Sequence, residues 1–173
     1  MKTLVIHPED KSTEFLSTIY EGKDWTVINK HIGNRLMKKA IKEHDRLIVL
    51  GHGTEKGLYD PDTFDNIIDS NLVYLLREME NNIYIWCNAD VFVKKYDLKG
   101  FYTGMIISED EEANLFCVNA SYLDVGISNI KFAESVAKHL DTNTELMMEN
   151  VKNDYIDEDN NIITFNNENI YSR

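Results

Sequence analysis

Short apolar runs alternate with longer amphipathic segments along most of this 173-residue chain, and that alternation limits the folds open to it. Runs typical of buried strands occupy 2–7, 25–29, 45–51, 83–86 and 100–107. Helical spacing of apolar residues marks the segments between them, as in the face formed by Leu36, Met37, Ala40 and Ile41. The pattern predicts an α/β protein, a three-layer αβα sandwich with a mainly parallel sheet.

The segment after the first strand is expected to be helical. Asp10 or Ser12 is placed to cap a helix that carries Phe15, Leu16 and Ile19 on one face. This helix would return the chain from the first strand to the second.

The C-terminal part is expected to be helical until a short tail. Ser108 and Glu111 have the spacing of a capping box. Apolar periodicity predicts helices over 72–79, 89–96, 130–140 and 145–151. In the Asn- and Asp-rich tail, apolar residues at 162–165 predict one short strand. With no evident domain boundary, we expect a single domain, 1–173, in which 155–173 form a peripheral strand and tail.

Composition excludes several classes of function. The formal net charge of −12 disfavours nucleic acid as a partner, because phosphate binding draws on Lys and Arg. No run approaches the roughly 20 apolar residues of a membrane helix, and the first residues do not resemble a signal peptide. Two cysteines form no disulfide framework, so a cytoplasmic location is expected. Of the two, Cys117 is expected in the core.

Residues at the carboxyl ends of the predicted strands are the candidates for function, because ligands of parallel sheets gather there. His7, His52 and Cys87 hold such positions. His52 alone fits an ordinary glycine turn, and Cys87 alone fits a small buried hydrophobe. If their two strands are neighbours, however, the backbones lie about 5 Å apart, within reach of a thiol–imidazole pair. A nearby imidazolium lowers the pKa of a thiol and favours the nucleophilic thiolate.

The order of these elements resembles that of the caspase-like cysteine peptidases, which include metacaspases, gingipains and separase. A strand ending in His-Gly is followed by a hairpin-like stretch, a helix and a strand ending in Cys87. "GHGTEKGLYD" is similar to the histidine motif of that group, including the later glycine, Gly57. The likeness covers roughly residues 1 to 110.

The resemblance implies a caspase-like fold and a Cys-His dyad. Cys87 would be the nucleophile and His52 the proton donor to the leaving amine. The backbone N–H groups of Gly53 and Cys87 would form the oxyanion hole. No third catalytic side chain is implied.

Substrate preference is expected to follow the charge of the loops beyond the strands. Those loops hold acidic residues and no arginine, which favours a Lys or Arg residue before the scissile bond of a peptide or protein substrate. Asp90 is the best single candidate for its partner, although acids at helix N-termini are also common for structural reasons. The acidic candidates for substrate binding are Glu9, Asp10, Asp90, Glu109 and Asp110.

A non-catalytic caspase-like or flavodoxin-like domain that binds a protein partner is the alternative. Bulky Trp86 beside the thiol, the acidic composition and the lack of a processing linker favour it. No phosphate-binding glycine loop follows the first strand. His7, His52, Cys87 and Asp90 lack metal-ligand spacing, so neither cofactor nor metal is expected. The sequence does not predict the oligomeric state.

Overall fold

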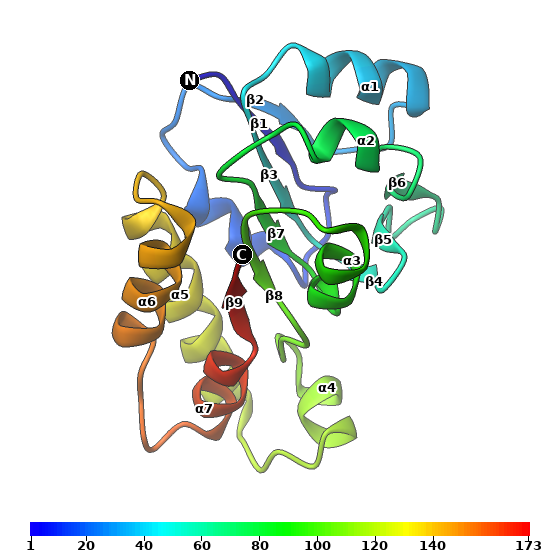
Figure 1. The fold of residues 1–173 in the computed structure, drawn as a ribbon. Coiled ribbons are helices and arrows are strands. Elements are labelled where there is room, and N and C mark those ends of the chain that lie inside the picture. The colour runs from blue at the N-terminus through cyan, green and yellow to red at the C-terminus, as the bar shows by residue number, and fades with distance from the viewer.

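A six-stranded sheet forms the centre of the computed structural model, which describes residues 1–173. Its strands are β1 (Thr3–Ile6), β2 (Thr26–Ile28), β3 (Arg46–Leu50), β7 (Ile83–Ile85), β8 (Phe101–Thr103) and β9 (Ile170–Ser172). They lie in the order β2-β1-β3-β7-β8-β9 (Figure 1). Every neighbouring pair is parallel except β8 and β9. The prediction of an α/β protein with a mainly parallel sheet is confirmed.

Helices cover both faces of this sheet and complete three layers (Figure 1). One face carries α1 (Asn34–Lys42), α2 (Val73–Leu76) and α3 (Ala89–Tyr96). The other carries the 3₁₀ helix η1 (Glu14–Ile19), α5 (Tyr122–His139), α6 (Thr144–Asp154) and α7 (Asn161–Glu168). Short helix α4 (Asp110–Leu115) lies beyond the carboxyl end of β8.

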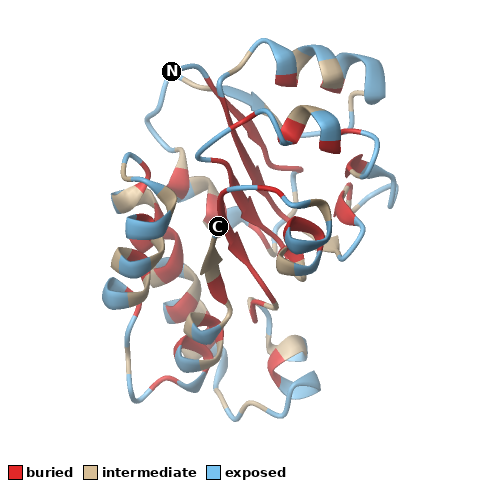
Figure 2. Ribbon diagram, viewed as in Figure 1, coloured by how far each residue is buried: buried red, intermediate tan, exposed pale blue.

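Alternation along the strands divides the apolar core in two. Leu47 and Val49 of β3 pack with α1 to α3, whereas Ile48 and Leu50 pack with η1 and α5. The pleat of a strand requires this alternation. Because both faces are covered, the central strands β1, β3, β7 and β8 are buried throughout (Figure 2) and are apolar runs in the sequence, whereas edge strand β2 is largely exposed.

A small antiparallel sheet follows β3 directly. It consists of β4 (Gly53–Thr54), β5 (Gly57–Tyr59) and β6 (Asn66–Ile68) and contains the hairpin expected from the sequence. Gly57 has a φ of 134°, and a Cβ there would lie 1.8 Å from the carbonyl oxygen of Ile68. Only glycine fits this crossing.

The strand predicted over 162–165 is wrong, because these residues belong to α7, and the strand of this region begins at Ile170. The side chain of Asn160 accepts hydrogen bonds from the N–H groups of Ile162 and Ile163 and caps the helix. Both isoleucines are buried from the helix.

Two predicted helix starts are also wrong. The capping box of α4 uses Glu109 and Glu112 rather than Ser108 and Glu111. The capping box begins one residue later than predicted, because the carboxylate of Glu112 accepts from the N–H groups of both Ser108 and Glu109. Helix η1 begins at Glu14 without any side-chain cap.

None of the helices has both the length and the apolar character required to cross a membrane.

Candidate active site

Adjacent strands β3 and β7 bring His52 and Cys87 to the same edge of the sheet. Leu50 lies opposite Ile85, and the N–H of Gly51 donates to the carbonyl of Ile85 at 3.1 Å. His52 and Cys87 each follow that pair by two residues. Both therefore leave the carboxyl edge on the face covered by η1 and α5.

Both side chains line one small cavity, of about 30 Å³. Such a volume holds about one water molecule. Further walls come from η1, α5 and the segment after β8, through Phe15, Leu16, Ile106, Ser108, Glu112 and Phe132. These walls leave Cys87 partly buried.

The environment of Cys87 favours the neutral thiol. Its Sγ donates to the carbonyl oxygen of Ile106 at 3.7 Å and makes no hydrogen bond with His52. Burial, and then the charge of Glu112, raise the pKa of Cys87 to about 11, despite the opposing hydrogen bond to Ile106. The expected lowering of this pKa by an imidazolium is therefore wrong, because burial and Glu112 outweigh the effects that favour the thiolate.

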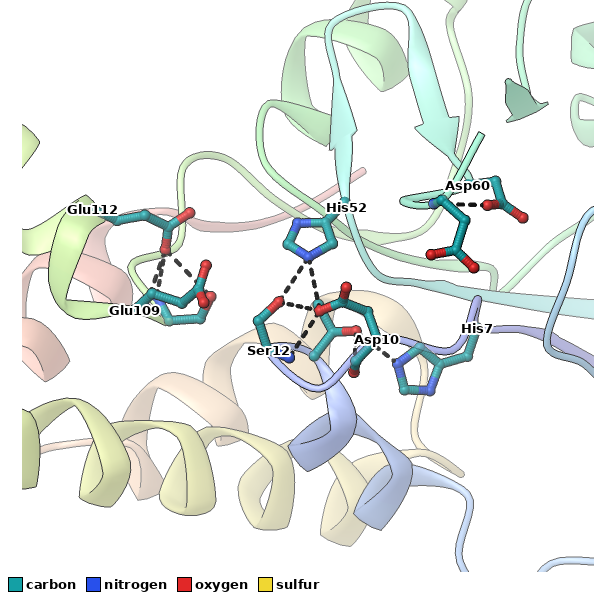
Figure 3. A network of polar contacts seen from close by, with 10 residues as sticks. His7, Asp10, Ser12, His52, Asp60, Glu109 and Glu112 are labelled. Atoms are coloured by element: carbon teal, nitrogen blue, oxygen red, sulfur yellow. Dashed lines mark hydrogen bonds and ion pairs between the residues drawn. The ribbon is translucent and has the colours of Figure 1, made fainter. Parts of the chain in front are cut away.

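His52 is held by the loop that follows β1 (Figure 3). Its Nε2 lies 2.8 Å from Oγ of Ser12 and 3.4 Å from Oδ1 of Asp10. The ring of Tyr59 stacks on the imidazole, with centroids 6.2 Å apart and planes 19° apart. The imidazole is therefore fixed in both position and orientation.

The carboxylate of Asp10 accepts hydrogen bonds from Ser12 of the same loop. Burial opposes its charge, yet hydrogen bonds from Oγ–H and N–H of Ser12, and the contact with His52, lower the pKa of Asp10 below its ordinary value. The Ser12 N–H bond is 2.8 Å long. Asp10 is thus an ionised carboxylate at neutral pH.

Sequence reasoning missed the role of Ser12, which was expected as one of two possible helix caps. Asp10 and Ser12 form a local turn in which the carboxylate accepts from the backbone two residues on. Asp and Ser at this spacing after a strand were the available signal. The contact with His52 is long-range and has no local pattern.

The indole of Trp86 leaves no room for a side chain at Gly53. A Cβ on Gly53 would lie 2.0 Å from Cδ1 of Trp86, and the φ of Gly53 is not positive. The indole packs across the hairpin and donates from Nε1 to the carbonyl oxygen of Thr54 at 3.1 Å. The positive φ of this turn belongs to Gly51, at 133°.

The two N–H groups expected to form an oxyanion hole are free of partners within the chain. Tyr59 N–H donates to the carbonyl of His52, so the next pair, Gly53 and Leu58, is non-hydrogen-bonded. The N–H of Gly53 therefore points away from β5. The N–H of Cys87 makes no hydrogen bond.

His7 ends β1 as a buried structural residue. It lies 3.0 Å from the hydroxyl of Tyr20 and 3.3 Å from Oγ1 of Thr13. Burial is the main cause that lowers the pKa of His7 to about 4. The imidazole is neutral at physiological pH.

The predicted substrate-binding acids do not converge on one point. Asp90 lies on α3, on the other side of the sheet, and pairs with Lys94 at 2.9 Å. Glu9 is exposed and accepts from the side chain of Asn29. Glu109 caps α4, where burial and Glu112 raise its pKa against the influence of His52.

Two open grooves adjoin the loop that holds Asp10 and Ser12. A groove of about 670 Å³ runs between η1, α4 and α5 and shares Phe15 and Ser108 with the cavity of Cys87. Another, of about 540 Å³, is lined by His7, Glu9 and Asp10. Only the groove between η1, α4 and α5 is lined by acidic residues and also shares wall residues with the cavity of Cys87.

Cys117 lies outside the core, contrary to expectation. It is exposed and follows α4 with a φ of 54°, where its N–H closes the helix by donating to Asn114. The short helix buries Ala113 instead.

No three His, Cys, Asp or Glu side chains converge in a metal-binding arrangement.

Comparisons of the chain with protein-family models, with curated proteins and with solved structures find no match.

Proposed function

We propose that this chain is a cysteine peptidase of the caspase-like type, in which Cys87 and His52 form the catalytic dyad. The observation that carries the proposal is the shared cavity of these two side chains, beyond adjacent parallel strands. The chain order supports it: β3 and His52, the small sheet, α2, then β7 and Cys87. Both cysteines are free, in keeping with a reducing compartment such as the cytoplasm.

Hydrolysis would proceed in two stages. As the sulfur of Cys87 attacks the substrate carbonyl carbon, the thiol proton passes to His52. The oxyanion accepts from the N–H groups of Gly53 and Cys87. His52 then protonates the leaving amine, the C–N bond breaks, and water hydrolyses the thioester.

The raised pKa of Cys87 supports a role of general base for His52. At neutral pH the thiol is protonated and bound to Ile106. A bound peptide would have to displace that contact and widen the cavity. Deprotonation would therefore accompany substrate binding and attack instead of preceding them.

The groove between η1, α4 and α5 favours a basic substrate residue. Glu14, Glu109 and Asp110 line it together with apolar Phe15 and Tyr122. A Lys or Arg side chain has an apolar stem and a charged end that match such walls. Asp90 would contribute least, because Lys94 neutralises it.

A positional-scanning library of fluorogenic peptides tests the proposal on the full chain. We expect cleavage after Lys or Arg. The Cys87→Ala and His52→Ala variants should each reduce hydrolysis to background, while Cys117→Ala should match wild type. Circular dichroism should show that the inactive variants remain folded.

Two results would contradict specific parts of this proposal. Hydrolysis that persists in Cys87→Ala would exclude the dyad. Preference for Asp before the scissile bond would exclude the acidic groove as the specificity site.

A protein-binding domain without activity is the second candidate. The partly buried thiol with its raised pKa favours it. So do exposed apolar side chains on and after α4 and along α5: Leu115, Phe116, Tyr122, Leu123, Ile127 and Ile130. If no peptide is cleaved and Cys87 remains unreactive toward peptide electrophiles, this candidate replaces the peptidase.

A further inference from the structure

The carboxylate of Asp10 and the hydroxyl of Ser12 both lie at Nε2 of His52. Oδ1 of Asp10 contacts the N–H and Oγ of Ser12 and lies 3.4 Å from Nε2 of His52. Oγ of Ser12 lies 2.8 Å from the same Nε2. In Figure 3 this nitrogen points at both residues, while the other ring nitrogen points away from them.

Counting protons assigns each of these bonds a donor. An ionised carboxylate only accepts hydrogen bonds, and a serine hydroxyl has one hydrogen to donate. The contact between Asp10 and Ser12 must use that hydrogen. The contact between Ser12 and His52 must then use a hydrogen on Nε2, with Oγ of Ser12 as acceptor.

Nδ1 of His52 consequently carries the lone pair when the imidazole is neutral. It has no hydrogen-bond partner in the chain, whereas Nε2 has two. The stack of Tyr59 on the ring, and the bond from its N–H to the carbonyl of His52, resist rotation of the side chain.

We infer that Asp10 and Ser12 are positioning residues that keep the proton of His52 on Nε2 and leave Nδ1 free to accept the thiol proton of Cys87. The inference rests on the proposed peptidase function for its catalytic meaning. It assigns Asp10 a role other than substrate binding. It also gives the dyad a side-chain partner, which the resemblance alone did not imply. Such a partner acts by fixing tautomer and orientation, as orienting groups do in other nucleophile–base pairs.

Nitrogen-15 NMR of the full chain tests the tautomer without any substrate. His52 is assigned by the loss of its signals in His52→Gln. At a pH where the ring is neutral, we expect two-bond and three-bond couplings to show hydrogen on Nε2, with a hydrogen-bonded Nε2–H resonance. Asp10→Ala and Ser12→Ala should each weaken or abolish that resonance.

The kinetics of peptide hydrolysis then test whether the tautomer of His52 affects catalysis. We expect Asp10→Ala to lower kcat about 10-fold or more, within the roughly 10²- to 10⁴-fold that a positioned proton-transfer group contributes, with KM unchanged. Asp10→Asn retains an acceptor oxygen and should keep both the Nε2–H signal and more of the kcat. Ser12→Thr should likewise rescue the loss in Ser12→Ala. Asp24→Asn removes an exposed charge before β2, away from the site, and should match wild type.

Hydrogen on Nδ1 in the wild-type protein would overturn the inference. So would an Asp10→Ala protein with unchanged NMR signals and unchanged kcat. Because the spectra need no turnover, absence of hydrolysis would refute the peptidase and leave the tautomer measurement to decide this inference separately.

Discussion

The thiol of Cys87 donates to the carbonyl oxygen of Ile106, with 3.7 Å between sulfur and oxygen. Neighbouring residues hold this acceptor in place. Asn166 of α7 binds both the N–H and the carbonyl of Ile107, at 2.7 and 2.9 Å. One residue further, the N–H of Ser108 donates to Glu112. The segment beside the thiol is therefore anchored at the two residues that follow Ile106.

Alkylation of Cys87 should be slow and steeply dependent on pH. With its pKa at about 11, roughly one thiol in a thousand is ionised at pH 8, and the thiolate is the reactive form. The rate with iodoacetamide should rise about tenfold per pH unit up to about pH 11. The measurement requires a Cys117→Ala background, because Cys117 is exposed.

Glu112→Gln provides the matched variant for that experiment. It removes the negative charge that helps raise the pKa of Cys87 and preserves a side chain that can close the capping box. Alkylation at pH 8 should therefore be faster than in the parent. A rate that levels off below pH 9 in the parent would contradict the raised pKa.

Asn166→Ala should destabilise the fold and uncover Cys87. Without this side chain, the N–H and carbonyl of Ile107 lose their buried partner, whereas the hydroxyl of Tyr155 keeps its hydrogen bond with Ser128. Each of these two unsatisfied groups costs about 1–3 kcal/mol, so the free energy of unfolding should fall by about 2–6 kcal/mol. Urea denaturation measures it, with exposed Thr164→Ala on the same helix as the control. Unchanged alkylation of Cys87 in a folded Asn166→Ala protein would show that this anchor does not control access.

Sequence could predict the strands that present His52 and Cys87, because both faces of those strands are buried and they are continuous apolar runs. Their adjacency was only a condition of the sequence argument, because the alternation of strands and helices does not determine the order of strands in the sheet. The sequence could not predict the contact of Ser12 with His52 or the hydrogen bonds of Asn166 with Ile107. Polar contacts between distant segments have no periodicity, and local rules assign such residues to caps or turns.

Cys117 shows a different limit. An apolar neighbourhood in the sequence, "NLFCVNA", favoured burial. Cys117 follows the end of α4 in a left-handed backbone conformation, however, and the short helix itself buries only Ala113. Burial of short helices depends on what they pack against.

Gly53→Ala should destabilise the protein through Trp86. The added Cβ would lie 2.0 Å from Cδ1 of the indole, so either the hairpin or the ring must move. Overpacking of this kind costs about 1–3 kcal/mol. Thermal unfolding and the fluorescence of Trp86 report the change, and Trp86→Phe in the same chain should recover part of the loss.

Gly126→Ala is the control substitution. Nothing lies within 4 Å of the position of its Cβ, and the residue is inside α5. Alanine there should stabilise the protein by about 0.5–1 kcal/mol. Equal effects at the two glycines would contradict the role of Gly53 described above.

Acid should destabilise the protein through His7. Burial lowers its pKa in the folded state to about 4, below its ordinary value of 6.5. Above pH 6.5 the imidazole is neutral in both the folded and the unfolded state, so it does not change how the free energy of unfolding depends on pH. Between pH 6.5 and 4 the unfolded chain binds the proton and the folded one does not, so stability falls as the pH falls, by up to about 3 kcal/mol.

The variant His7→Gln removes this titration. The free energy of unfolding from urea titrations should therefore depend less on pH in the variant than in wild type across this window. Parallel curves would show that His7 is protonated in the folded protein, and that its contacts with Tyr20 and Thr13 do not require the neutral form.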